Sequence, residues 1–225
     1  MKDGIIPMIK EYWNSDVEFD RIEYIKQYAK NKTVLDVGCI GNINISSSDF
    51  PFNWFHYKLI KSAKEVIGLD INQPYIEFLK QSGYNIINID LTSEILGSEM
   101  LMKLGKFQLI VMGELIEHIS KPQVFFYNIN NLLSKNGHIL ITTPNASSLS
   151  FVIGSLMRKK RVLSPQHVCI HSIETISTLL RTYNFTIVKW KYYSCSPRYK
   201  NFKKLVFYIA PQLAAGLIII AKKVT

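Results

Sequence analysis

The chain has 225 residues, which is long enough for one sizeable hydrophobic core and short for two. Apolar residues make up 48% and charged residues 20%, which excludes a disordered chain, and three scattered cysteines exclude a disulfide framework. The net charge of +10 is concentrated late in the chain, because residues 119–225 hold fifteen lysines and arginines against one acid, Glu174, which favours anionic partners.

Polar and apolar stretches alternate from the start of the chain to Pro144 in a strand–helix rhythm. The apolar periodicity predicts helices at 16–30, 53–64, 74–81 and 122–133, the last stopped by Asn136-Gly137. Apolar runs predict strands at 33–38, 65–71, 85–90, 107–112 and 138–142. Runs that are apolar throughout are typical of parallel strands buried on both faces, so the pattern predicts an α/β fold with a doubly wound sheet.

The rhythm changes after Pro144. We expect an inserted helix with a basic loop within 146–165. A second helix should run from an N-cap at Ser172 to Tyr183, with Asn184 in the left-handed closing position. Two last strands, at 185–193 and 217–222, bring the expected number of strands in the sheet to seven.

The uncharged run at 205–221 approaches the shortest length of a membrane span. Pro211 and Gly216 interrupt it, so we expect a helix at 202–209, a turn and a buried strand instead. Residues 1–10 carry no signal-peptide pattern. We therefore expect one domain over residues 1–225 and a cytoplasmic location.

Three acids stand at the ends of successive expected strands. Asp36 and Gly38 lie in the V-L-D-V-G-C segment of residues 34–39, Asp70 closes the second strand, and Asp90 closes the third. Ligands of open α/β sheets bind beyond the carboxyl ends of the strands, where a carboxylate can accept the hydroxyl protons of a ribose. The three acids together predict one crevice that binds a nucleoside-like cofactor.

Five segments in register, VLDVGC, GLDI, NIDL, FQLIVMGELIEHI and NGHILITTPN, resemble the successive motifs of class I S-adenosylmethionine-dependent methyltransferases. The likeness is greatest to the branch of ubiquinone-pathway O-methyltransferases and surface-glycan-cluster enzymes. It implies a Rossmann-like, mostly parallel seven-stranded sheet with helices on both faces. Residues 33–145 would form the cofactor-binding core and 146–225 the acceptor side. The implied cofactor, S-adenosyl-L-methionine, would contact Asp36, Gly38, Cys39, Gly41, Asp70, Ile71, Asp90, Leu91, Met112, Gly113 and Glu114.

The loop after the first strand departs from the family pattern D-x-G-x-G-x-G, since Ile40 and Asn42 replace its second and third glycines. Gly41 can restore the flexibility one position early, and asparagine tolerates a positive φ. A nicotinamide enzyme is disfavoured because G-x-G-x-x-G is absent.

The segment E-L-I-E-H brings Glu114, Glu117 and His118 near one another at an expected helix start. We assign His118 as the catalytic general base and assign no metal ligand. Two alternatives stay open. These side chains could merely brace the helix, or, as in relatives with a similar E-x-x-E-H, they could form a magnesium site with His167.

The acceptor is expected to be an anionic small molecule, such as a nucleotide-sugar or a phosphorylated or lipid-linked glycan, methylated on oxygen. The basic run Arg158-Lys159-Lys160-Arg161 falls where the family shapes its acceptor pocket, and Tyr192, Tyr193 and Tyr199 could stack on a sugar or base. RNA methylation, peripheral membrane contact and a catalytically inactive regulatory subunit remain alternatives, and the oligomeric state stays open.

Overall fold

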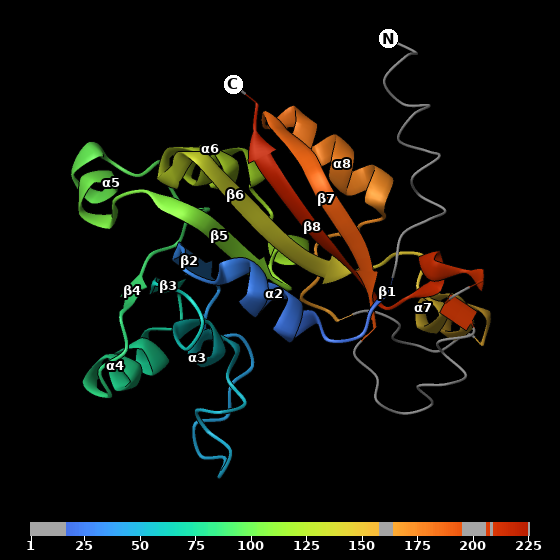
Figure 1. Ribbon diagram of the computed structural model, residues 1–225, viewed down its shortest axis with the longest axis horizontal. Helices are drawn as coiled ribbons and strands as arrows, with labels where there is room; N and C mark the ends of the chain where they lie inside the picture. The colour runs from blue at the N-terminus through green and yellow to red at the C-terminus, as the bar shows by residue number, and fades with distance from the viewer. Residues whose placement is uncertain (1–16, 158–163, 195–205, 208, 225) are drawn as a thin grey trace.

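A computed structural model describes residues 17–157, 164–194, 206–207 and 209–224. Its strands form one sheet in the order β1-β7-β8-β6-β5-β2-β3-β4 (Figure 1). The strands are β1 Val17–Glu18, β2 Thr33–Val37, β3 Glu65–Asp70, β4 Ile86–Asn88, β5 Phe107–Gly113, β6 Leu133–Pro144, β7 Phe185–Tyr193 and β8 Gly216–Lys223. Only β8 runs antiparallel to its neighbours. The expected mostly parallel sheet is confirmed, but the described residues form eight strands, because the two-residue β1 pairs with β7.

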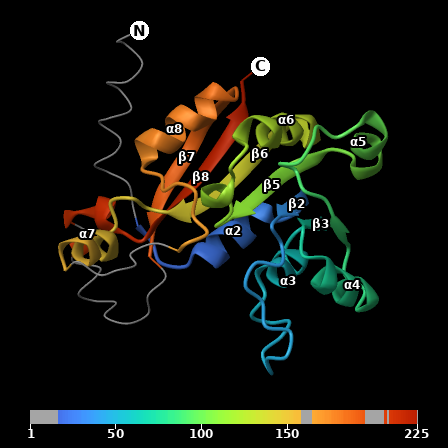
Figure 2. The ribbon, with the colours of Figure 1, turned by 180° about the vertical axis from the view of Figure 1, so that it is seen from behind.

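Helices cover both faces of the sheet (Figures 1 and 2). They are α2 Arg21–Ala29, α3 Phe55–Ile60, α4 Gln73–Gln81, α5 Ser98–Leu104, α6 Pro122–Leu132, α7 Leu149–Leu156 and α8 Ile173–Thr182, with short 3-10 helices η1 Ile116–His118 and η2 Pro211–Leu213. Alternate strand residues divide between two cores: Leu35 belongs to the core that includes α6 and α8, and Val34 belongs to the core that includes α2 and α3. This alternation is the period-2 geometry of a strand buried on both faces.

Two helices begin later than expected, for local reasons. The helix expected over 16–30 starts at Arg21, because the Asp20 carboxylate caps it by accepting the Glu23 N–H and Val17 pairs with Tyr192 in the sheet. The helix expected over 53–64 spans only Phe55–Ile60. Its N-cap, Trp54, is held extended while its indole N–H donates to the Cys39 carbonyl.

The stop expected at Asn136-Gly137 comes shortly after the actual end of the helix, in a stretch where the pairing of β6 with β5 shifts register. Helix α6 ends at Leu132 and strand β6 begins at Leu133, so both residues lie within the strand. Gly137 serves close packing, since a Cβ there would lie 2.9 Å from the Phe107 carbonyl oxygen. Helix α5 was not predicted from the sequence.

In the last third of the chain, the described residues form the main elements that the sequence predicts. Ser172 caps α8 in a reciprocal capping box with Thr175, and Asn184 has φ 63°. Within the uncharged run at 205–221, the described residues include η2 and the start of β8. No helix among the described residues is long and apolar enough to cross a membrane. Arg158 to Arg161, Tyr199 and most of the helix expected at 202–209 lie outside the described residues.

Candidate functional site

The carboxyl ends of β2, β3, β5 and β6 meet at one edge of the sheet, because these strands are parallel neighbours in that part of the sheet. A cavity of about 280 Å³ lies at this edge. It is lined by Arg21, Ile25, Gly38, Cys39, Ile40, Gly41, Asn42, Ile43, Asn44, Asn53, Trp54, Phe55, Gly113 and Thr142. Of the residues expected to bind cofactor, Gly38, Cys39, Gly41 and Gly113 therefore lie on the cavity wall.

The loop after β2 takes its shape from two glycines. Gly38 has φ 74° and Gly41 has φ 54°, conformations that other residues adopt only with strain. A Cβ at Gly38 would also lie 3.1 Å from a Leu115 methyl group. Asn42 is not among the described residues with positive φ, so Gly41 alone supplies the flexibility that the replaced glycines would have given.

Asp70 fastens this loop to the start of α4. One carboxylate oxygen accepts the Ile40 N–H at 2.9 Å, and the other accepts the Ile71 and Asn72 N–H groups at 2.8 and 3.1 Å. Such charge-assisted bonds are about twice as strong as neutral ones. A carboxylate has about four acceptor positions, so these three bonds leave capacity for a ligand hydroxyl. Asp70 itself does not line the cavity but adjoins it through Ile40.

Seven expected cofactor contacts do not line the cavity: Asp36, Asp70, Ile71, Asp90, Leu91, Met112 and Glu114. Asp90 is exposed, and one of its oxygens accepts both the backbone N–H and the hydroxyl of Thr92 at 2.7 Å, as in a tight turn. The side chains of Leu91 and Met112 are buried in the core, whereas Ile71 is exposed. Contact between a cofactor and any of the expected site residues stays a prediction.

Asp36 points into the protein and pairs with His56, a residue that the sequence analysis missed. The His56 Nδ1 atom lies 2.8 Å from an Asp36 oxygen, and both side chains are buried. Burial raises the pKa of Asp36 despite the opposing effect of His56. The His56 ring packs between Trp54 and Gly68, where a Cβ would approach the ring to 2.9 Å. The pair thus joins β2 to the start of α3, beside Trp54 on the cavity wall.

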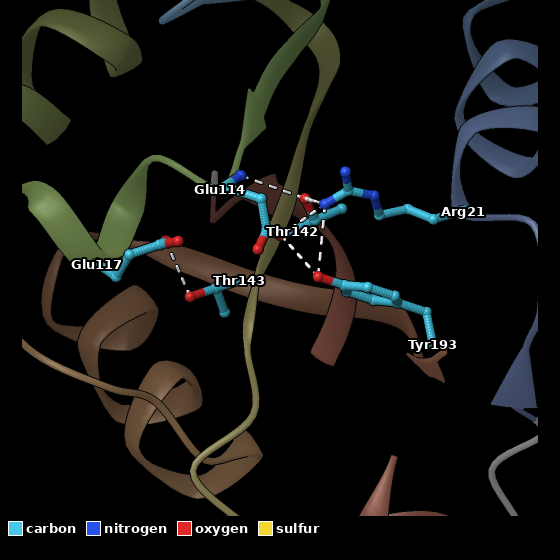
Figure 3. A network of polar contacts seen from close by, with 6 residues as sticks. All are labelled: Arg21, Glu114, Glu117, Thr142, Thr143 and Tyr193. Atoms are coloured by element: carbon cyan, nitrogen blue, oxygen red, sulfur yellow. Dashed lines mark hydrogen bonds and ion pairs between the residues drawn. The ribbon is translucent and has the colours of Figure 1, made fainter. Parts of the chain in front are cut away.

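A second polar network connects α2, β5, β6 and β7 (Figure 3). The Arg21 guanidinium donates to a Glu114 oxygen at 2.7 Å and to the Thr142 hydroxyl at 3.2 Å, and the Tyr193 hydroxyl donates to the same Glu114 oxygen at 2.8 Å. Glu114 has φ 53°, a left-handed conformation that is uncommon for a residue with a side chain. Gly216 makes room for Tyr193, because a Cβ at Gly216 would overlap the tyrosine ring.

Arg21 was also missed from the sequence, although one signal was present. A cation in the first turn of a helix faces the positive end of the helix dipole, which is unfavourable without a compensating contact. Glu114 supplies that contact, and Arg21 is the only charged side chain on the cavity wall among the described residues.

Glu117, His118 and His167 form a separate cluster in which one ligand atom from each residue lies within 4.8 Å of the others. The His118 Nδ1 atom donates to the Gln166 carbonyl at 3.0 Å, so Nε2 keeps its lone pair in the neutral ring. Burial raises the pKa of Glu117 to about 7, and the Thr143 hydroxyl donates to its carboxylate. The expected helix start here is a 3-10 turn, η1, and Glu114 is not a member of this cluster.

The buried pair can be tested by its effect on stability. We expect His56→Ala to lower the free energy of unfolding by about 3–5 kcal/mol, because it strands the Asp36 carboxyl without its partner. Urea unfolding followed by circular dichroism measures this change. The double variant Asp36→Leu, His56→Leu should lose less than His56→Ala, since no buried polar group is left unpaired. A single variant as stable as the parent protein would contradict the assignment.

Comparison with known proteins gives consistent results. A family model described as a methyltransferase domain matches residues 16–189. The chain is 27% identical over 165 residues to a ubiquinone biosynthesis O-methyltransferase of Pelagibacter ubique, covering 64% of this chain and 63% of that protein. It is 26% identical over 165 residues to the protein of the same name from Rickettsia felis, covering 65% of this chain and 61% of that protein. The chain thus spans about three fifths of the length of these curated relatives.

Solved structures share the fold at low sequence identity. A SAM-dependent methyltransferase from Archaeoglobus fulgidus superposes with a TM-score of 0.58 at 19% identity, covering 96% of this chain and 98% of that one. A methyltransferase from Bacillus halodurans, described as putative, superposes with a TM-score of 0.59 at 14% identity. The match covers 91% of this chain and 99% of that one.

Proposed function

Because the chain belongs to the methyltransferase domain family, we propose that it transfers a methyl group from S-adenosyl-L-methionine to an oxygen atom of a small-molecule acceptor. One observation carries the proposal: a cavity at the carboxyl ends of parallel strands, walled by a glycine loop that an acid at the next strand end holds in place. Nucleoside cofactors bind at this position in open α/β sheets. Binding of the demethylated cofactor, S-adenosylhomocysteine, measured by calorimetry, tests it.

The side chains around the cavity suit this cofactor. Asp70 can accept the ribose hydroxyl protons, and Gly38 and Gly41 allow the cofactor close to the backbone. Arg21 can bind the carboxylate of the methionine part, since a guanidinium matches a carboxylate in a two-pronged geometry. We assign residues 33–145 to cofactor binding and 146–225 to the acceptor side of a single domain.

When bound, the cofactor supplies a methyl group on a positively charged sulfur, which needs no activation by the protein. The protein therefore aligns the two reactants and removes a proton from the acceptor. His118 suits the second task, because its bond to the Gln166 carbonyl fixes the tautomer and leaves Nε2 able to accept a proton. Arg21 and Tyr193 hold Glu114 at the cavity edge, where it shapes the entry of the acceptor.

The names of the curated relatives favour oxygen as the methylated atom. The charge of residues 119–225, fifteen lysines and arginines against Glu174, favours an acceptor that carries phosphate or carboxylate, such as a nucleotide-sugar or a phosphorylated glycan. We also propose that the protein works in the cytoplasm.

A metal-assisted form of the same reaction has a specific observation behind it. The Glu117, His118 and His167 cluster offers two imidazoles and a carboxylate, and the Nδ1 atom of His167 is buried with no hydrogen-bond partner among the described residues. Such a donor set suits a first-row divalent ion better than magnesium. The ion would lower the pKa of an acceptor hydroxyl, and the three side chains would hold it.

For the cofactor, we expect Asp70→Ala to weaken S-adenosylhomocysteine binding by about 1.5–3 kcal/mol, the range for losing hydrogen bonds to a charged group. Calorimetry on the parent and the variant measures it. Glu99→Ala, which removes an exposed acid of α5, is the matched control and should bind normally. Unchanged affinity in Asp70→Ala would remove the ribose assignment.

Variants of His118 and His167 distinguish a general base from a metal site. If His118 acts alone as a base, His118→Ala should lose about 100-fold or more in kcat, while His167→Ala and excess chelator have little effect. If a metal is required, both variants and the chelator should abolish turnover, and a divalent ion should restore only the chelated parent. His138→Ala, on the same sheet but nearer the amino end of β6, is the control. Full activity of both variants would exclude both roles.

For the acceptor, kcat/KM should fall with rising salt while kcat changes little. Steering by the summed charge can raise encounter rates by about tenfold or more, and the Debye length shrinks to about 8 Å at physiological ionic strength. Steady-state kinetics at low and high salt, once an acceptor is identified, measure the effect. A neutral acceptor with salt-independent kinetics would overturn the inference from charge.

A further inference from the structure

A second cavity, of about 190 Å³, lies at the carboxyl ends of β6 and β7, near the start of α8. Its polar wall is formed by Asn145 and Ser147 after β6, Ser172 and Glu174 at the start of α8, and Gln212 of η2. None of these residues lines the first cavity. Because β6 and β7 both run antiparallel to β8, their carboxyl ends lie at the edge of the sheet that carries the first cavity. The two cavities are therefore separate spaces at one edge of the sheet.

The polar wall is held in place by hydrogen bonds of the buried Asn145 side chain. Its amide nitrogen donates to the backbone carbonyls of Gln212 and Ala214 at 2.7 and 2.9 Å. Its oxygen accepts the Ser147 N–H at 3.1 Å. Asn145 thus joins the segment after β6 to η2. The wall is fixed before any ligand arrives, which lowers the entropic cost of binding.

Three side chains on the wall are available to a ligand. Ser147, Glu174 and Gln212 come from three different segments, and their side chains make no hydrogen bond or ion pair with another described residue. They offer hydroxyl and amide donors together with hydroxyl, amide and carboxylate acceptors. The buried Tyr192 and Ile173 add an aromatic and an aliphatic surface. This wall suits a ligand that donates and accepts hydrogen bonds and also has an apolar face.

The charge of the ligand follows from Glu174. Residues 119–225 hold fifteen lysines and arginines and this one acid, and the acid lies on the cavity wall. Among the described residues, no lysine or arginine lines the cavity. A carboxylate repels phosphate and carboxylate groups, whereas it accepts hydrogen bonds from hydroxyl groups. The cavity therefore favours a neutral, hydroxyl-rich ligand within a half of the chain that is otherwise basic.

We propose that this cavity binds a neutral sugar ring. Ser147, Glu174 and Gln212 exchange hydrogen bonds with its hydroxyl groups, and its C–H face packs against Tyr192. The volume fits a single ring, since pockets that enclose drug-sized ligands measure roughly 300–1,000 Å³. That the sugar is part of the methyl acceptor rests on the proposed function, whereas sugar binding itself does not. In an anionic acceptor, the phosphate or carboxylate then lies outside this cavity.

A short path of contacts connects the sugar cavity to the proposed base. Asn145 pairs with His171 in an isolated β-bridge, and the Cys169 Sγ atom lies 3.1 Å from the His171 Nε2 atom. The Cys169 N–H donates to the Glu117 carbonyl at 3.3 Å, and Glu117 directly precedes His118. The wall that holds the sugar is thus joined through His171 and Cys169 to the turn that carries the base.

The test is saturation-transfer NMR on the full chain with the methyl glycosides of glucose, galactose, mannose, rhamnose and N-acetylglucosamine. At least one glycoside should bind the parent, and titration gives its dissociation constant. Glu174→Ala should weaken this binding by about tenfold or more, and Gln212→Ala by a smaller factor, because bonds to a charged group contribute more. Arg181→Ala, which removes an exposed charge near the other end of α8, is the matched control and should bind like the parent.

Two further measurements keep the outcomes distinct. Circular dichroism and S-adenosylhomocysteine binding should be the same in the variants and the parent. A parent that binds a glycoside but not S-adenosylhomocysteine would refute the proposed function and leave the sugar site standing. Absence of saturation transfer to all five glycosides would overturn the sugar site, as would binding that both substitutions leave unchanged. Displacement of the glycoside by inorganic phosphate would overturn the assignment of a neutral ligand.

Discussion

The contact between Asp36 and His56 is the constraint from which the candidate site takes its form. Taking a carboxyl and an imidazole out of water is expensive, and it is tolerated here because each supplies the other's hydrogen-bond partner at 2.8 Å. The pair joins β2 to α3. Trp54, at the start of the same helix, adds a second bond to the Cys39 carbonyl. The loop is therefore held by Trp54 and by Asp70, and the cavity lies between the loop and the start of α3.

The segment E-L-I-E-H shows how a short sequence divides between two tasks. Glu114 takes a left-handed conformation at the end of β5, and the next residues tighten into the 3-10 turn of η1. This geometry directs Glu114 toward Arg21 and Tyr193, while Glu117 turns inward to Thr143 (Figure 3). A regular helix would have placed the two carboxylates near one another, which is what their spacing predicts. The tight turn separates them and leaves Glu117 with His118 and His167.

Features that rest on local chemistry could be predicted from the sequence, and features that rest on distant partners could not. Apolar runs identified the central strands because burial on both faces leaves no other composition, and Ser172 and Asn184 marked the ends of α8 through their own backbone bonds. The glycine loop and Asp70 were recognised from their places after strand ends, whereas Asp36 turns into the core and Asp90 does not line the cavity. His56 and Arg21 could not be identified from the sequence because their partners are distant in the chain. The partner of His56 lies 20 positions away, and the partner of Arg21 lies 93 positions away. The packing role of Gly137 could not be predicted for the same reason, since the Phe107 carbonyl close to it lies on another strand.

Gly216 ties a buried strand to the edge of the site. Its missing side chain leaves the space that the Tyr193 ring occupies, and the hydroxyl of that ring holds Glu114. A descendant of this sequence that gained a side chain at position 216 would have to exchange Tyr193 for a smaller residue, and Glu114 would lose its hydroxyl partner. Positions 193 and 216 are thus bound to change together in evolution. A replacement of Gly216 would therefore change the contacts of Glu114 even if no residue on the cavity wall changed.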